Sequence, residues 1–143
     1  MSTKLFRLGR QVARSLSMLA FAACGSVPAL AQQVGVVIRV IPESIRVAVE
    51  VSGPPRSAWS FRDSYAGVLG LGNRIERFAV QDKSGAEIPT RKLAPGQFDS
   101  AKAASRFRYE VNLTPPLSSA DSARVSWLNR QRGLLMLADL LPI

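Results

Sequence analysis

The chain has 143 residues, with 19 lysine and arginine residues against 10 aspartate and glutamate residues, one cysteine and no histidine. The absence of histidine removes the commonest metal ligand and the commonest general base at neutral pH, which excludes most hydrolytic mechanisms. Beyond the first 31 residues, the basic residues are scattered along the chain instead of clustered, so the sequence lacks the electrostatic pattern of a nucleic-acid-binding protein.

The first 31 residues have the pattern of a cleavable signal peptide. Their start carries four basic side chains and no acidic one, at Lys4, Arg7, Arg10 and Arg14. The apolar run at residues 16–23 is too short to cross a bilayer, which takes about 20 residues of helix. Pro28 follows this run, and Ala29 and Ala31 supply the small residues that a signal peptidase accepts. We therefore expect cleavage after Ala31 and export to the periplasm or out of the cell.

A second interpretation of the N-terminal region centres on Cys24. The residues before it, Phe-Ala-Ala, resemble a lipoprotein box, in which the cysteine is acylated and becomes the first mature residue. Against this, Phe21 stands where a branched aliphatic residue is usual, and the site formed by Ala29 and Ala31 lies just downstream. Both interpretations predict export. Acylation of Cys24 would in addition anchor the protein in the cell envelope, and membrane contact is expected only in that case.

Cleavage after Ala31 leaves residues 32–143, a mature chain of 112 residues with 15 basic and 10 acidic side chains and a net charge of +5. This chain has no cysteine, so neither disulfides nor thiolate chemistry are available to it. Its length is sufficient for one domain with a core of its own but not for two.

The mature chain opens with two predicted strands. Residues 36–41 form a run of β-branched side chains, and residues 45–51 alternate strictly, with apolar side chains at the odd positions. The link at residues 42–44 is short enough for the two strands to pair as a hairpin. The Ser-Gly-Pro-Pro sequence at residues 52–55 is expected to end the second strand.

The clearest strand covers residues 106–113. One face carries four apolar side chains, Phe107, Tyr109, Val111 and Leu113, and the other face carries polar ones. The apolar face is expected to lie in the core. Before it, the sequence predicts a strand at residues 77–81 and an extended piece at 87–93, joined by an Asp-Lys-Ser-Gly turn at 82–85. Residues 100–104 fit one turn of helix.

Two further strands are predicted near the C-terminal end of the sequence, at residues 123–128 and 134–137, with a polar turn between them. No segment has a sustained helical period. Short strands at this spacing favour an all-β fold, specifically a single β-sandwich-like domain.

Two patterns resemble catalytic or cofactor sites but fit other roles better. The Gly-Val-Leu-Gly-Leu-Gly sequence at residues 67–72 resembles a dinucleotide-binding loop, but Ile75 occupies the position of the third glycine and no βαβ unit surrounds it. Asp63 and Glu76 could be a carboxylate pair, but nothing in the sequence brings them together, so we expect two solvated surface charges.

The aromatic residues Trp59, Phe61 and Tyr65 fit either a ligand groove or the core, and the core is the better interpretation. The carboxylates of the chain lack the spacing of a calcium loop. The sequence therefore predicts no catalytic residue, no cofactor and no metal ligand.

Four stretches resemble the N-terminal β domain of the glycyl-aminopeptidase type of zinc metallopeptidases: residues 59–67 (WSFRDSYAG), 71–75 (LGNRI), 126–128 (SWL) and 133–142 (GLLMLADLLP). In that family the zinc and the general base come from an H-E-x-x-H helix in the catalytic domain that follows. The present sequence has no such motif, so no catalytic residue is carried over. The resemblance implies a β-sandwich-like module that packs beside a peptidase domain.

These observations predict an exported, non-enzymatic module that works by binding. Its partner is expected to be a protein or peptide, of which a separately encoded peptidase domain is one example, and not a nucleic acid. An envelope-associated lipoprotein or assembly subunit is the alternative, based on Cys24, the net charge of +5 and the apolar residues near the C-terminal end. An enzyme that uses carboxylates alone is a third hypothesis.

Overall fold

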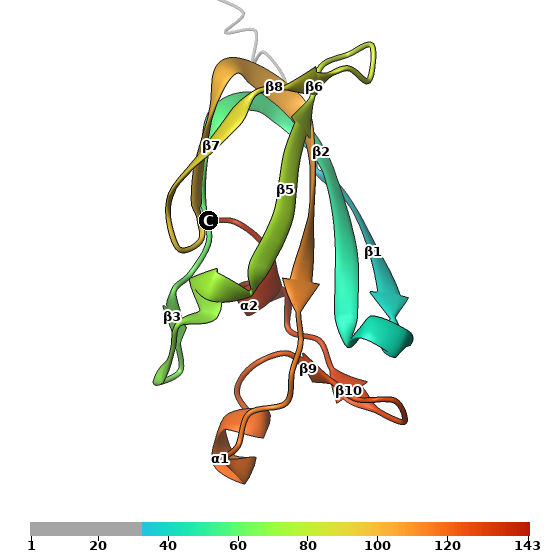
Figure 1. Ribbon diagram of the computed structural model, residues 1–143, viewed down its shortest axis with the longest axis vertical. Helices are drawn as coiled ribbons and strands as arrows, with labels where there is room; N and C mark the ends of the chain where they lie inside the picture. The colour runs from blue at the N-terminus through green and yellow to red at the C-terminus, as the bar shows by residue number, and fades with distance from the viewer. Residues whose placement is uncertain (1–32) are drawn as a thin grey trace, which may run out of the picture. The chain divides into compact units, whose positions relative to one another are not determined.

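Two long antiparallel strands, β2 (Arg46–Ser60) and β8 (Gln97–Asn112), are the central elements of the fold (Figure 1). The computed structural model describes residues 33–143. The predicted cleavage site at Ala29 and Ala31 and the candidate acylation site Cys24 lie outside the described residues. The described part of the chain is an all-β domain, as the sequence predicts, with antiparallel strand pairing throughout its sheets.

Both long strands bend sharply, which folds the sheet over on itself and gives the sandwich-like arrangement (Figure 1). The pairing register of β2 with β8 shifts on both sides of Arg56, next to the Gly53-Pro54-Pro55 sequence. Proline has no N–H to donate to a ladder, and such residues are tolerated where pairing is interrupted. The expectation that residues 52–55 end the strand is therefore wrong, because β2 continues through the bend to Ser60.

The half of β2 before the bend belongs to the larger layer. The strand order there is β1 (Gly35–Ile41), β2, β8, β5 (Ile75–Gln81) and β6 (Glu87–Ile88). A short 3-10 helix at Pro42–Ser44 joins β1 to β2, so the predicted hairpin of the first two strands is confirmed. Beyond the bend, β7 (Thr90–Ala94) pairs with the beginning of β8. Residues 100–104 are part of β8, so the predicted turn of helix is wrong.

The core lies between the two halves of the bent sheet. All four apolar side chains of the predicted core face, Phe107, Tyr109, Val111 and Leu113, are buried. Val47, Val49 and Val51 lie beside them on β2 and are also buried. Rings from both halves meet there in a cluster of Trp59, Phe61, Phe78, Phe98, Phe107 and Tyr109.

Smaller elements lie at the end of the sandwich away from the bend (Figure 1): β3 (Ser64–Tyr65), β4 (Val68–Leu69), a 3-10 helix (Leu71–Arg74), α1 (Ser119–Ser122), β9 (Trp127–Leu128), β10 (Gly133–Leu134) and α2 (Leu137–Leu140). β9 and β10 pair as a hairpin, so the predicted strands near the C-terminal end exist but are short. The predicted Asp-Lys-Ser-Gly turn is confirmed, because Asp82 Oδ1 accepts hydrogen bonds from the amides of Ser84 and Ala86.

Candidate functional site

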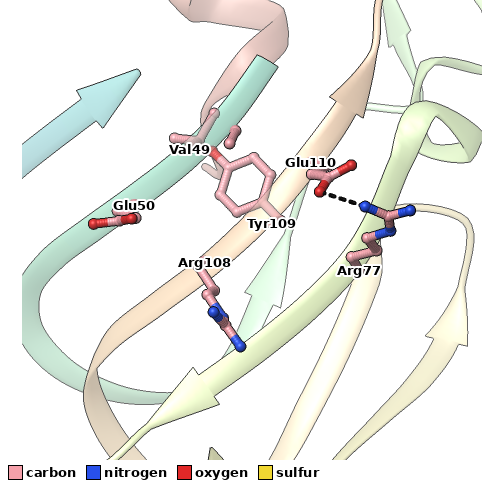
Figure 2. A pocket seen from close by; sticks show the side chains of 7 residues that line it. Val49, Glu50, Arg77, Arg108, Tyr109 and Glu110 are labelled. Atoms are coloured by element: carbon pink, nitrogen blue, oxygen red, sulfur yellow. Dashed lines mark hydrogen bonds and ion pairs between the residues drawn. The ribbon is translucent and has the colours of Figure 1, made fainter. Parts of the chain in front are cut away.

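The outer face of the larger layer carries charged side chains around a shallow hollow (Figure 2). In the larger layer, the even-numbered positions of β2 and β8, at residues 46–50 and 106–112, point away from the core, because successive side chains of a strand alternate between faces. A pocket of about 270 Å³ lies over β8, and Glu50, Arg108, Glu110 and Arg77 line it. A second pocket of about 460 Å³ shares Glu50 and Arg108 with the first.

The carboxylates in this hollow are already bound to guanidinium groups. Glu110 Oε1 accepts a hydrogen bond from Arg77 at 2.8 Å, the contact drawn in Figure 2, and its Oε2 lies 3.4 Å from Arg46. Glu50 is paired with Arg39. A general base must accept a proton from its substrate, and either carboxylate would first have to leave its arginine. The arrangement therefore fits a charged surface better than a pair of catalytic acids.

A bulge in β5 directs Arg77 toward Glu110. The register between β5 and β8 shifts between Glu76 and Ala79, and Arg77 has a φ of 51°, a left-handed conformation that is uncommon for any residue except glycine. The bulge places the Arg77 guanidinium over β8. Its ion pair with Glu110 is largely exposed on the arginine side, so we expect it to contribute little to stability.

The second candidate site is the free edge of β1, called here the β1 edge (residues 35–41). β1 pairs with β2 over all seven residues without a register shift, and among the described strands it has no neighbour on its other side. Its sequence, Gly-Val-Val-Ile-Arg-Val-Ile, contains one charge, at Arg39. Val36, Val37 and Val40 are 37%, 49% and 46% exposed. The strand thus offers apolar side chains to solvent on both of its faces.

The other edges of the described sheet are protected in ways that β1 is not. β6 has two residues, and Pro89 follows it directly. β7 carries Arg91 and Lys92, and its pairing with β8 shifts register after Lys92. Short length, proline, charge and bulges are the usual means by which proteins prevent pairing between exposed edges. A proline, Pro42, also follows β1, but β1 is seven residues long and pairs without a register shift, and its one charge, Arg39, is bound to Glu50.

The carboxylates and aromatic residues that the sequence analysis considered for a catalytic pair or a ligand groove have structural roles. Asp63 Oδ1 accepts a hydrogen bond from the amide of Gly72, whereas Glu76 forms an ion pair with Arg46, so the two carboxylates have separate partners. Trp59 and Phe61 are buried in the core as predicted. Tyr65 lies under the guanidinium of Arg62, 5.9 Å from it.

The glycine-rich sequence at residues 67–72 is a tight connection and not a phosphate-binding loop. β3 and β4 form a hairpin with Ala66 and Gly67 at positive φ, and Gly70 turns the chain into the 3-10 helix that follows. Gly72 lies against the backbone of Pro95, where a Cβ atom would come within 2.7 Å of the proline carbonyl. Gly67 and Gly70 therefore serve tight turns, and Gly72 serves the packing of two loops.

A buried polar cluster connects the C-terminal residues to the sheet, and sequence reasoning missed it. Asp139 accepts hydrogen bonds from the amide and hydroxyl of Ser126 and from Arg74 Nη1 at 3.1 Å. Desolvation lowers the pKa of Arg74, and the charge of Asp139 opposes that lowering. Tyr109 donates a hydrogen bond to the carbonyl of Leu140. Both carboxylate oxygens of Asp139 are engaged within the protein, so the cluster has a structural role.

Within residues 33–143, no three histidine, cysteine, aspartate or glutamate side chains gather closely enough to hold a metal ion. The helices of that part of the chain include none that is long and apolar enough to cross a membrane. Comparisons of the chain with protein-family models, with curated proteins and with solved structures find no match. The resemblance to the peptidase N-terminal domain therefore stays a prediction from the sequence.

Proposed function

We propose that this protein is an exported, non-catalytic binding module that takes up an extended segment of a partner protein along the β1 edge. The observation that carries the proposal is the unprotected state of that edge: seven residues in regular pairing, with Val36, Val37 and Val40 exposed and the single charge already bound. A monomeric protein that exposes such an edge risks aggregation, so its retention favours a role in binding.

Strand addition would satisfy both kinds of group that β1 exposes. The backbone N–H and C=O groups on the outer side of an edge strand form hydrogen bonds with an added strand, and alternate side chains supply specificity. Val37 would lie beside the partner on the outer face, and Val36 and Val40 on the core face next to Val51 and Val47 of β2. The partner would therefore be an extended segment with β-branched or aromatic residues.

The sequence resemblance suggests which exported protein could supply this segment. A separately encoded zinc peptidase domain is the partner that it favours, with the present module as its accessory. Assembly with other envelope proteins is the alternative, and acylation at Cys24 would favour it. Mass spectrometry of the mature N-terminus separates the two cases: a first residue of Gln32 without lipid mass excludes acylation, whereas a lipid-modified Cys24 supports envelope anchoring.

The binding proposal is tested with the full chain, exported and purified from its native compartment. Val37→Lys places a charge on the β1 edge at a half-exposed position, so the domain should still fold. Leu117→Lys is the matched control, because Leu117 is fully exposed and lies outside the sheet. We expect a partner from the exported fraction to bind the unchanged protein and the Leu117 variant but not the Val37 variant. Equal binding by all three would overturn the proposal.

The non-catalytic part of the proposal has its own test. The purified protein should release no amino acids from glycine-containing peptides and should hydrolyse no glycoside substrates, with or without added zinc. Hydrolysis that Glu110→Gln abolishes would contradict the proposal, since it would show that a carboxylate of the outer-face hollow is catalytic.

A further inference from the structure

We infer that a second copy of this chain occupies the β1 edge when no partner is bound, through antiparallel pairing of two β1 strands about a two-fold axis at Ile38. The inference rests on the proposed strand-adding role of this edge and adds its regulation: the copy protects the edge, and a partner must displace it. It follows from the order of side chains in β1, which is complementary to itself.

The position of the axis follows from the requirements of antiparallel pairing. Residues that lie opposite each other must share a face of the sheet, so the axis passes through a residue and not between two residues. With the axis at Ile38, all seven residues of β1 find a partner, Gly35 opposite Ile41 of the copy and Val36 opposite Val40. An axis at Arg39 would place two guanidinium groups directly opposite each other, which is unfavourable.

The core face of the paired strands would be continuous and apolar. Val36 lies opposite Val51 of β2, and Val40 lies opposite Val47. The dimer therefore forms rows of four valines across the interface, Val51, Val36, then Val40 and Val47 of the copy. The central row has Ile38 beside Val49 in each copy. Val36 and Val40, which are both partly exposed in the single chain, would cover each other.

The outer face brings no like charges together in the same register. Arg39 of one copy lies opposite Val37 of the other, and Val37 lies opposite Glu50 of its own β2. Each arginine of one copy therefore shares a row with a glutamate of the other, and no like charges face each other. Both faces of β1 thus favour a second copy of this chain as the occupant.

The interface is small, because one strand of seven residues from each copy forms it. Interfaces below about 1,200 Å² of total buried area are usually weak. A weak dimer fits a protective role, since a partner that buries more surface can replace the copy. We expect dissociation over roughly the micromolar range of concentration.

Sedimentation of the purified exported protein at increasing concentration tests the dimer. The unchanged protein and Leu117→Lys should pass from monomer to dimer, and Val37→Lys should weaken the dimer by about tenfold or more, because its new ammonium group would face Arg39 of the copy. Adding Arg39→Glu to Val37→Lys should restore the dimer, since opposite charges then face each other. A monomer at every concentration, or a dimer that Val37→Lys leaves unchanged, would overturn the inference.

Thiol cross-linking tests the register. Cys24 is the single cysteine of the chain, so Cys24→Ser combined with Ile38→Cys leaves one thiol per chain. In the proposed dimer this thiol lies opposite the same thiol of the second copy. Opposed Cβ atoms are about 4.5–5.5 Å apart, within reach of a short cross-linker. Val40→Cys is the control. Residue 40 lies on the same face as residue 38 and is more exposed, but in the dimer it lies opposite Val36 of the second copy. Rapid cross-linking at position 38 and not at 40 is expected, and the reverse result would overturn the register.

The two proposals fail in different ways. A protein that stays monomeric but binds a partner through Val37 would overturn the dimer and leave the proposed function standing. A dimer that depends on Val37, together with partner binding that does not, would overturn the proposed use of the β1 edge for partners.

Discussion

Asp139 Oδ2 accepts a hydrogen bond from the backbone amide of Ser126 at 2.7 Å, and its Oδ1 accepts one from the Ser126 hydroxyl at 2.6 Å. The same hydroxyl oxygen accepts a bond from the amide of Met136. Arg74 completes the cluster from the other side and also donates through Nε to the carbonyl of Asn112 at the end of β8. This cluster fixes the β9–β10 hairpin and α2 against the sheet.

Asp139→Asn should lower the free energy of unfolding by about 3 kcal/mol. The side chain of Asp139 is fully buried, and the substitution leaves the largely buried guanidinium of Arg74 without a counter-charge. The new amide group also turns a donor toward Ser126 or Arg74, which have donors of their own. Urea unfolding followed by circular dichroism measures the change. Asp99→Asn, which breaks the exposed pair with Arg91, is the control and should change stability little.

The strands of this fold could be predicted where the pattern is local. Alternation alone places Phe107, Tyr109 and Val111 on one face, and all three are buried. The prolines at 54 and 55 gave the wrong prediction, because a local rule reads them as the end of a strand. At a sharp bend the register shifts and fewer backbone N–H donors are needed for pairing, so β2 continues through the two prolines.

The candidate site could be predicted only in part. The sequence predicts residues 36–41 as a strand, but it does not show that this strand lies at an edge. That position depends on the pairing of β2 with β8 and of β8 with β5, between segments far apart in the chain. The Arg74–Asp139 pair spans 65 residues and has no motif. Residues 134–137 were predicted as strand, but β10 ends at Leu134, and Leu137 begins a turn of helix that buries Leu140.

Stability should fall as the pH rises above about 10, and Tyr109 should account for part of this fall. Burial raises the pKa of Tyr109, so the folded protein holds this proton more tightly than the unfolded chain does. The resulting stabilisation is complete below the pKa of an unfolded tyrosine and is lost as the pH rises from there through the folded pKa. Unfolding free energies measured between about pH 9 and 11 would show this slope.

Tyr109→Phe should reduce that slope and also cost about 1–2 kcal/mol at neutral pH, because the carbonyl of Leu140 loses its donor. Tyr65→Phe is the comparison, since Tyr65 is the other tyrosine of the chain and is partly exposed. Identical slopes in the two variants would contradict the role assigned to Tyr109.

Gly72→Ala should destabilise the domain by about 1–3 kcal/mol for a steric reason. A Cβ atom at this position would lie 2.7 Å from the carbonyl carbon and oxygen of Pro95, and backbone atoms cannot move aside as a flexible side chain can. Gly85→Ala provides the contrast. Gly85 has a φ of 88° but open space around it, so its cost should be conformational, at about 1 kcal/mol. Thermal unfolding of both variants separates crowding from backbone preference, and a smaller loss for Gly72→Ala would refute the close packing of the two loops.

Phe78→Ala should cost about 3 kcal/mol and alter the fluorescence of Trp59. The Phe78 ring stacks on Phe98 at 4.3 Å and lies 5.3 Å from Trp59, so it joins the two halves of the bent sheet. The indole nitrogen of Trp59 is buried without an acceptor among the described residues. Removing the ring would admit water to this nitrogen and shift the emission to longer wavelength. Trp127→Phe removes the second tryptophan, so the signal reports Trp59 alone. An unshifted spectrum in a folded Phe78→Ala protein would mean that Phe78 does not shield Trp59.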